Sequence, residues 1–153
     1  MRKLGIYVHI PFCKKKCEYC DFISFSGIES KEEDYIKALI QDINYYSNFV
    51  KDYEVDTIYF GGGTPSYIDS SCIVEVLNTI KDSYHISENA EITLEVNPGT
   101  VNEEKLLAYK NVGINRISIG LQSTHDRLLE LIGRIHNYSE FLETYQLARK
   151  VRI

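Results

Sequence analysis

The sequence predicts an α/β fold built on a parallel β-sheet, because strand-like runs alternate with helical patterns along the whole chain. Hydrophobic residues make up 44% of the 153 residues and charged residues 25%, which suits one packed domain. No linker or low-complexity tract interrupts the pattern. Strict alternation of this kind implies right-handed crossovers between neighbouring strands, and we therefore expect a single parallel sheet.

The expected strands are four short runs rich in β-branched and aromatic residues. In chain order they cover residues 5–10, 56–60, 91–96 and 115–120. Apolar residues at helical spacing follow each run, and together these segments make four βα units.

The helical segments are bounded by residues that typically cap helix ends. Three pairs have the spacing of an N-terminal capping box: Ser30 with Glu33, Thr100 with Glu103, and Asn137 with Glu140. The second helix is expected to begin near Asp69. Gly113 and Gly133 are expected to end the third helix and the fourth helical region, because glycine readily adopts the left-handed conformation that closes a helix.

The charge balance narrows the classes of function. With 17 Lys+Arg and 22 Asp+Glu the formal net charge is −5, whereas a general nucleic-acid binder usually carries a basic excess. No apolar run approaches the roughly 20 residues that span a bilayer. The N-terminus has no signal-peptide pattern, so we expect a cytoplasmic protein without a transmembrane segment.

Chemically equipped residues follow every expected strand. A cysteine follows the first strand, a Gly-Gly-Gly-Thr-Pro run the second, Glu95-Val96-Asn97-Pro98 closes the third, and Gln122 follows the fourth. Functional groups in parallel α/β folds gather at the carboxyl ends of the strands. The sequence therefore predicts one shared site at that end of the sheet.

Three of the four cysteines, Cys13, Cys17 and Cys20, fall within eight residues, while Cys72 is remote. Clustered thiols in a reducing compartment more often bind metal or carry out redox chemistry than form disulfides. Three thiolates can hold a [4Fe–4S] cluster and leave one iron open to a small ligand. The alternative is zinc or iron held in some other way, and a zinc site would need a fourth ligand such as His9.

The CxxxCxxC motif after the first strand resembles that of the radical S-adenosylmethionine (SAM) superfamily. Five blocks together resemble the HemN/HemW family of oxygen-independent coproporphyrinogen III dehydrogenases and haem chaperones. They are YVHIPFC at 7–13, CDF at 20–22, GGGTP at 61–65, EVNP at 95–98 and GRIHN at 133–137. The resemblance implies that the four βα units are the N-terminal part of a partial, TIM-like (β/α)6 barrel.

By this resemblance, Cys13, Cys17 and Cys20 hold a [4Fe–4S] cluster, and SAM binds the open iron through its amino and carboxylate groups. The reduced cluster would cleave SAM to methionine and a 5′-deoxyadenosyl radical. The residues that match SAM-binding or cofactor-adjacent positions of the family are Tyr7, Tyr19, Gly62, Gly63, Thr64, Glu95, Gln122 and Arg134. The resemblance assigns no further catalytic residue.

Two function classes share this framework. One is oxidative decarboxylation of coproporphyrinogen III to protoporphyrinogen IX, and the other is binding and delivery of haem by a chaperone. The dehydrogenases typically carry a further cysteine where this chain has Phe22, and they have an N-terminal extension that this chain lacks. Both departures favour the haem-chaperone branch, which leaves open whether the chain is an enzyme.

The implied ligands and partners are haem or a porphyrinogen, a reductant protein such as flavodoxin or ferredoxin, and a haem-acceptor protein. The sequence does not identify the acceptor, the electron donor or the oligomeric state. Family members are longer than residues 1–153, with later barrel strands and a C-terminal domain. We therefore expect these residues to form a truncated radical SAM core that holds the cluster ligands and most of the SAM site.

Overall fold

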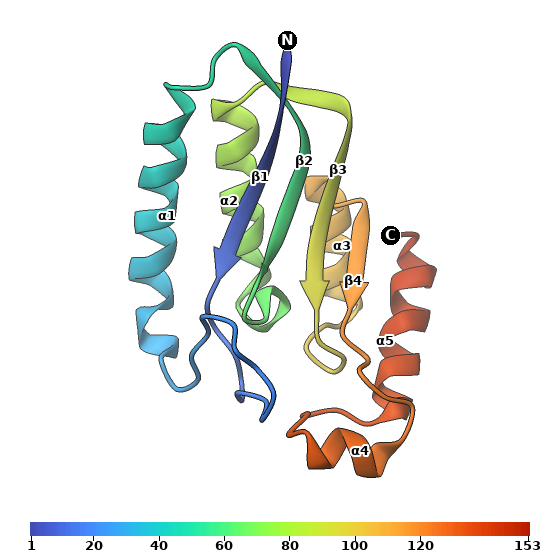
Figure 1. Ribbon diagram of the computed structural model, residues 1–153. Coiled ribbons are helices and arrows are strands. Elements are labelled where there is room, and N and C mark those ends of the chain that lie inside the picture. Colours follow the sequence, from blue (N-terminus) through green and yellow to red (C-terminus); the bar gives the residue numbers. More distant parts are fainter.

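The structure is a computed structural model that describes all residues, 1–153, and it contains one four-stranded sheet in the order β1-β2-β3-β4 (Figure 1). Every neighbouring pair is parallel, which confirms the predicted α/β fold. The strands are β1 (Arg2–Ile10), β2 (Tyr53–Gly62), β3 (Ile86–Val96) and β4 (Arg116–Ile119). The first three begin earlier than predicted, and the further barrel strands stay a prediction.

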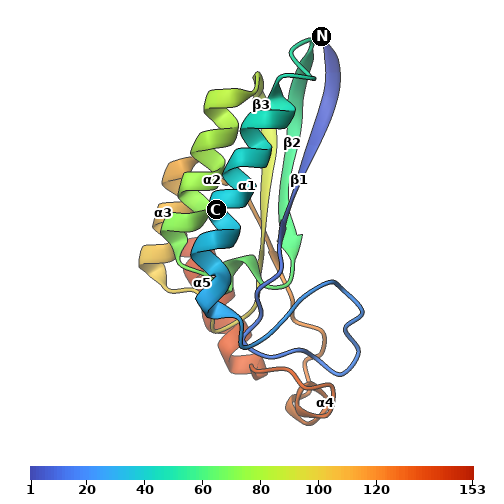
Figure 2. The same ribbon diagram turned by 90° about the vertical axis from the view of Figure 1, so that its left-hand side faces the viewer.

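Helices α1, α2 and α3 cover one face of the sheet and leave the opposite face without a helix (Figure 2). The α-helices are α1 (Glu32–Ser47), α2 (Ser70–Ser83), α3 (Glu103–Val112), α4 (Asp126–Leu131) and α5 (Tyr138–Val151). Two short 3-10 turns, η1 (Glu29–Lys31) and η2 (Pro65–Tyr67), precede α1 and α2. None of the helices combines the length and apolar character needed to cross a membrane.

The hydrophobic core lies between the sheet and the helices. On β3, Ile92, Leu94 and Val96 are buried on the helix-covered side, whereas Glu95 points to the open face of the sheet. Ile73 and Leu77 of α2 are fully buried against the same core. Because side chains alternate along a strand, burying one set of residues in the core aims the other set at the open face.

Several helix ends form as the sequence predicts. The Asp69 carboxylate accepts a hydrogen bond from the Ser71 amide at 2.8 Å and caps α2. Asn137 and Glu140 form the complete capping box of α5. Gly113 adopts a φ of 101° at the end of α3, a conformation that disfavours residues with a side chain.

Two predicted capping boxes are wrong. Ser30 lies within η1, and α1 begins at Glu32 with Lys31 at the cap position, where no side chain caps it. At α3 the capping residue is Asn102, whose side chain accepts from the Lys105 amide at 2.8 Å. The Thr100 hydroxyl instead donates to the Asn97 carbonyl at 2.7 Å, because it closes the turn that follows β3.

Replacing Leu94 by alanine is expected to lower the free energy of unfolding by about 2–5 kcal/mol, the usual range for truncating a buried leucine. Leu94 is fully buried on a strand that has neighbours on both sides. Urea unfolding followed by circular dichroism measures the change. The matched control is Leu131→Ala, since Leu131 is 73% exposed. Equal losses in both variants would contradict this placement of the core.

Candidate functional site

A cavity of about 540 Å³ opens at the carboxyl ends of the strands. Residues that follow all four strands line it, as expected for a parallel sheet. Its walls include nearly all the residues that the sequence singled out: Cys13, Cys17, Cys20, Tyr19, Gly62, Gly63, Thr64, Glu95, Gln122 and Arg134. Only Tyr7 of the predicted set lies outside the lining. The volume is within the usual range for a small-molecule site, roughly 300–1,000 Å³.

The three clustered cysteines lie on a loop that is closed at its base by backbone pairing. The Cys13 amide donates to the Phe25 carbonyl at 2.9 Å, and the Phe25 amide donates to the Pro11 carbonyl at 2.8 Å. The Lys16 ammonium reaches across the loop to the carbonyls of Phe22 and Ser24, at 2.8 and 3.2 Å. These contacts hold the loop beneath β1 as a defined wall of the cavity.

All cysteines are free thiols, and each clustered thiol has a different neighbour. The Cys13 sulfur lies 3.6 Å from the Thr64 hydroxyl, and the Cys17 sulfur accepts from Arg134 at 3.7 Å. The Cys20 sulfur lies 3.9 Å from the Ser24 hydroxyl. No three His, Cys, Asp or Glu side chains converge on the position of a single metal ion. Thiolates around a cluster of several irons bind separate corners, so a cluster does not need that convergence.

The glycine run after β2 brings Thr64 against the first cysteine. The Gly63 and Thr64 amides donate to the carbonyls of Ile10 and Phe12, both at 2.8 Å. A methyl group on Gly63 would lie only 2.8 Å from the Phe12 carbonyl oxygen, so no larger residue fits without moving the backbone. Glycine is therefore required here for close packing of two backbone segments.

A continuous polar network crosses the cavity from the glycine run to Arg134. The Asn97 side chain makes both connections. Its Nδ2 atom donates to the Thr64 hydroxyl at 2.9 Å, and its Oδ1 atom accepts from Arg134 Nη2 at 2.8 Å. Asn97 is a site residue that the sequence analysis did not assign. Its position directly after β3, two residues beyond Glu95, was the available signal.

Arg134 connects the widest set of partners in the site. Its Nη2 atom donates to the Gly120 carbonyl at 2.7 Å, in addition to Asn97. Its Nη1 atom donates to the Tyr19 hydroxyl at 3.3 Å and to the Cys17 sulfur. The Nε atom is buried and has no hydrogen-bond partner, while other atoms of the Arg134 side chain line the cavity. A guanidinium in the wall of a cavity suits an anionic or carbonyl group of a ligand.

Tyr19 and Gln122 lie at the rim of the cavity. Tyr19 is 47% exposed. Its partial burial raises the pKa of the phenol, and this effect outweighs the Arg134 guanidinium, which lowers that pKa. Gln122 adopts a φ of 68°, which is uncommon for a residue other than glycine. Backbone strain of this kind concentrates at functional sites.

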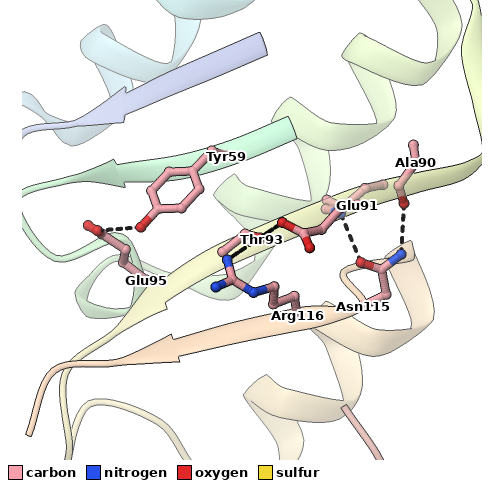
Figure 3. Close-up of polar contacts among 8 residues, drawn as sticks. Tyr59, Ala90, Glu91, Thr93, Glu95, Asn115 and Arg116 are labelled. Atoms are coloured by element: carbon pink, nitrogen blue, oxygen red, sulfur yellow. Dashed lines mark hydrogen bonds and ion pairs between the residues drawn. The ribbon is translucent and has the colours of Figure 1, made fainter. Parts of the chain in front are cut away.

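Glu95 projects from β3 onto the open face of the sheet, where it meets Tyr59 of β2 (Figure 3). The Tyr59 hydroxyl donates to Glu95 Oε1 at 2.7 Å. Tyr7 packs against the Tyr59 ring with 6.3 Å between ring centroids and bonds His9 Nδ1 at 2.9 Å. Tyr7 therefore lies one side chain away from the carboxylate, and it is 59% exposed.

The family model of the radical SAM superfamily matches residues 7–153 of the chain. The protein named heme chaperone HemW of Haemophilus influenzae is 41% identical over 151 residues, 95% of this chain. HemW of Escherichia coli strain K12 is 39% identical over 146 residues, again 95% of this chain. The chain spans 39% of the length of each of these two relatives.

The fold also matches a solved structure of the radical SAM enzyme coproporphyrinogen III oxidase, HemN, from Escherichia coli. The TM-score is 0.91 and the sequences are 28% identical. The match covers 98% of this chain and 35% of that chain. The predicted resemblance and the predicted arrangement of strands and helices are thereby confirmed.

Proposed function

The chain belongs to the radical SAM superfamily, and on that basis we propose that it binds a [4Fe–4S] cluster and SAM and serves haem metabolism as a haem chaperone. The names of the relatives at 39–41% identity support the chaperone role. One observation carries the proposal. Three thiols that are close in sequence and polar groups from four separate strand ends line a single cavity.

In this proposal Cys13, Cys17 and Cys20 hold the cluster. Their loop is closed at its base and braced by Lys16, so its backbone is held in place before the cluster binds. When bound, the reduced cluster with SAM supplies the radical chemistry that defines the superfamily. The protein contributes binding, orientation and the exclusion of water.

The other groups fit the two ends of SAM. Arg134 lines the cavity, and its guanidinium charge suits the carboxylate of the methionine part. Glu95 and the backbone of Gly62 and Gly63 are acceptors suited to its amino group. The Asn97 side chain binds both Arg134 and the Thr64 hydroxyl, and that hydroxyl lies beside the Cys13 sulfur. These contacts connect the first cysteine to Arg134.

Anaerobic reconstitution with iron and sulfide tests this proposal. We expect about four irons and four sulfides per chain, and an electron paramagnetic resonance signal of the reduced protein that changes when SAM is added. We also expect haem titration to saturate at a defined stoichiometry. Zinc without sulfide, or absence of any response to SAM, would overturn the assignment of cluster and cofactor.

Coproporphyrinogen III dehydrogenation is the second candidate function. The likeness to HemN at a TM-score of 0.91 favours it. Phe22 argues against it: this side chain lines the cavity and is 69% exposed at the position where the dehydrogenases typically have a cysteine. Release of carbon dioxide from coproporphyrinogen III by the reconstituted protein would establish this alternative, and haem binding without that release favours the chaperone. A reductant protein and a haem acceptor are the partners that the chaperone role implies.

A further inference from the structure

The open face of the sheet carries a side-chain contact that the cavity lining does not explain. Glu95 reaches the cavity, but its hydrogen-bonding partner Tyr59 is not part of the lining. In the register of β2 and β3, Tyr59 pairs with Thr93, so Glu95 is its diagonal neighbour one step closer to the cavity. A long aromatic side chain can span that diagonal, and the phenol meets the carboxylate there.

We propose that Tyr59 is the positioning residue that orients Glu95 for SAM. The phenol binds Oε1 and so holds the carboxylate in one orientation beside the cavity that Glu95 lines. This inference rests on the proposed SAM-binding function. It adds Tyr59 as the residue that holds the Glu95 carboxylate in place. Tyr59 touches Glu95 and not the cavity, so it acts through the carboxylate.

Tyr59 supplies the one side-chain hydrogen bond that Glu95 receives (Figure 3). Arg116 is the nearby cation on this face, but it pairs with Glu91 at 3.6 Å and donates to the Thr93 hydroxyl at 3.2 Å. No ion pair competes for Glu95. The orientation of the carboxylate therefore depends on the phenol rather than on a salt bridge.

Gly61 lies beside both the Tyr59 ring and the Glu95 carboxylate. A methyl group added to Gly61 would lie 2.9 Å from the Tyr59 ring and 3.0 Å from Glu95 Oε2. The absence of a side chain at this position thus lets the tyrosine ring and the carboxylate approach the same stretch of backbone. Tyr59 and Gly61, both on β2, therefore lie against Glu95.

Tyr7 braces the tyrosine from β1. Its ring stacks on the Tyr59 ring at 26°, and its hydroxyl bonds His9 Nδ1. The other nitrogen of His9 lies 2.7 Å from the Ile23 carbonyl, at the end of the cysteine loop. The chain of contacts from the cysteine loop through His9 and Tyr7 to Tyr59 gives Tyr7 a role outside the cavity lining.

The test compares SAM affinity by equilibrium titration of the reconstituted protein and its variants. Tyr59→Phe keeps the ring but removes the hydroxyl, and we expect SAM to bind about 3- to 10-fold more weakly, since the lost bond is to a charged group. In a Glu95→Ala background the same substitution is expected to change the affinity by less than about twofold, because the carboxylate it would orient is gone. Iron content should be unchanged throughout, and Tyr45→Phe, at an exposed site on α1, is the control.

A second readout does not need the cofactor. Burial is the first cause that raises the pKa of Tyr59, and the bond to Glu95 is the second. Nuclear magnetic resonance titration of the labelled phenol should therefore show a lower Tyr59 pKa in Glu95→Ala than in the wild type. An unchanged phenol pKa would contradict the Tyr59–Glu95 bond itself.

The outcomes separate the inference from the function beneath it. Wild-type protein that fails to bind SAM overturns the proposed function, and the positioning role with it. Wild-type protein that binds SAM, together with Tyr59→Phe that binds equally well, overturns the positioning role alone. Equal losses from Tyr59→Phe with and without Glu95 would show that the tyrosine acts on the fold and not through the carboxylate, which also overturns the positioning role.

Discussion

Replacing Cys17 by alanine is expected to abolish incorporation of the iron–sulfur cluster. A cluster of four irons held by three thiolates has no spare protein ligand. Mutating a residue that only hydrogen-bonds to a metal ligand already costs ~10–100-fold in metal affinity. We therefore expect a loss of more than about 100-fold for the ligand itself. Cys17 is half-buried in the cavity wall, and its sulfur contacts Arg134, so alanine also removes that contact.

Iron and sulfide analysis after anaerobic reconstitution measures the effect. Cys72→Ala is the matched control, because Cys72 lies on α2 outside the cavity, where burial raises the pKa of its thiol to about 11. Cys17→Ala with a full cluster, or Cys72→Ala without one, would refute the ligand assignment. Circular dichroism of both apo variants distinguishes loss of a ligand from loss of the fold.

Replacing Arg134 by lysine is expected to weaken SAM binding by about 10- to 100-fold, although the charge is kept. Lysine cannot reproduce a planar fork that donates to Asn97, Gly120 and Tyr19 together. We further expect the free energy of unfolding to fall by about 1–3 kcal/mol, because the partly buried acceptors lose their donors.

Calorimetric titration with SAM and urea unfolding measure these two effects. Arg127→Lys on α4 is the control, since Arg127 is exposed and lies outside the cavity lining. Unchanged SAM affinity in Arg134→Lys would show that the guanidinium is structural only. Cluster content provides a third comparison, because the Cys17 thiol would lose a donor but keep its position.

The arrangement of strands and helices was predictable from the sequence because local pattern and tertiary context agree. Ile92, Leu94 and Val96 alternate with polar residues, and that alternation alone places Glu95 on the opposite face. Asn137 and Glu140 form a capping box because both partners lie within one helical turn. In each case the deciding interactions are short in sequence.

Contacts between distant segments were not predictable in the same way. Thr100 has the spacing of a helix cap, but it bonds Asn97 because the turn after β3 competes for its hydroxyl. Asn97 joins the site only because β2 and β3 place it beside Thr64, 33 residues away in sequence. Tyr7 matches a cofactor-adjacent position of the family, and its packing against Tyr59 on the neighbouring strand could not be read from the sequence. Residue identity alone does not encode such pairings.

The bond between Arg134 and Cys17 joins residues 117 positions apart, and the Glu18 amide also donates to the Ile132 carbonyl at 3.1 Å. The ligand site is thus a product of global folding rather than of a local motif. A ligand that binds only the folded state raises its stability by mass action, by about 2.7 kcal/mol at a concentration 100 times the dissociation constant. Thermal denaturation would therefore report cofactor occupancy.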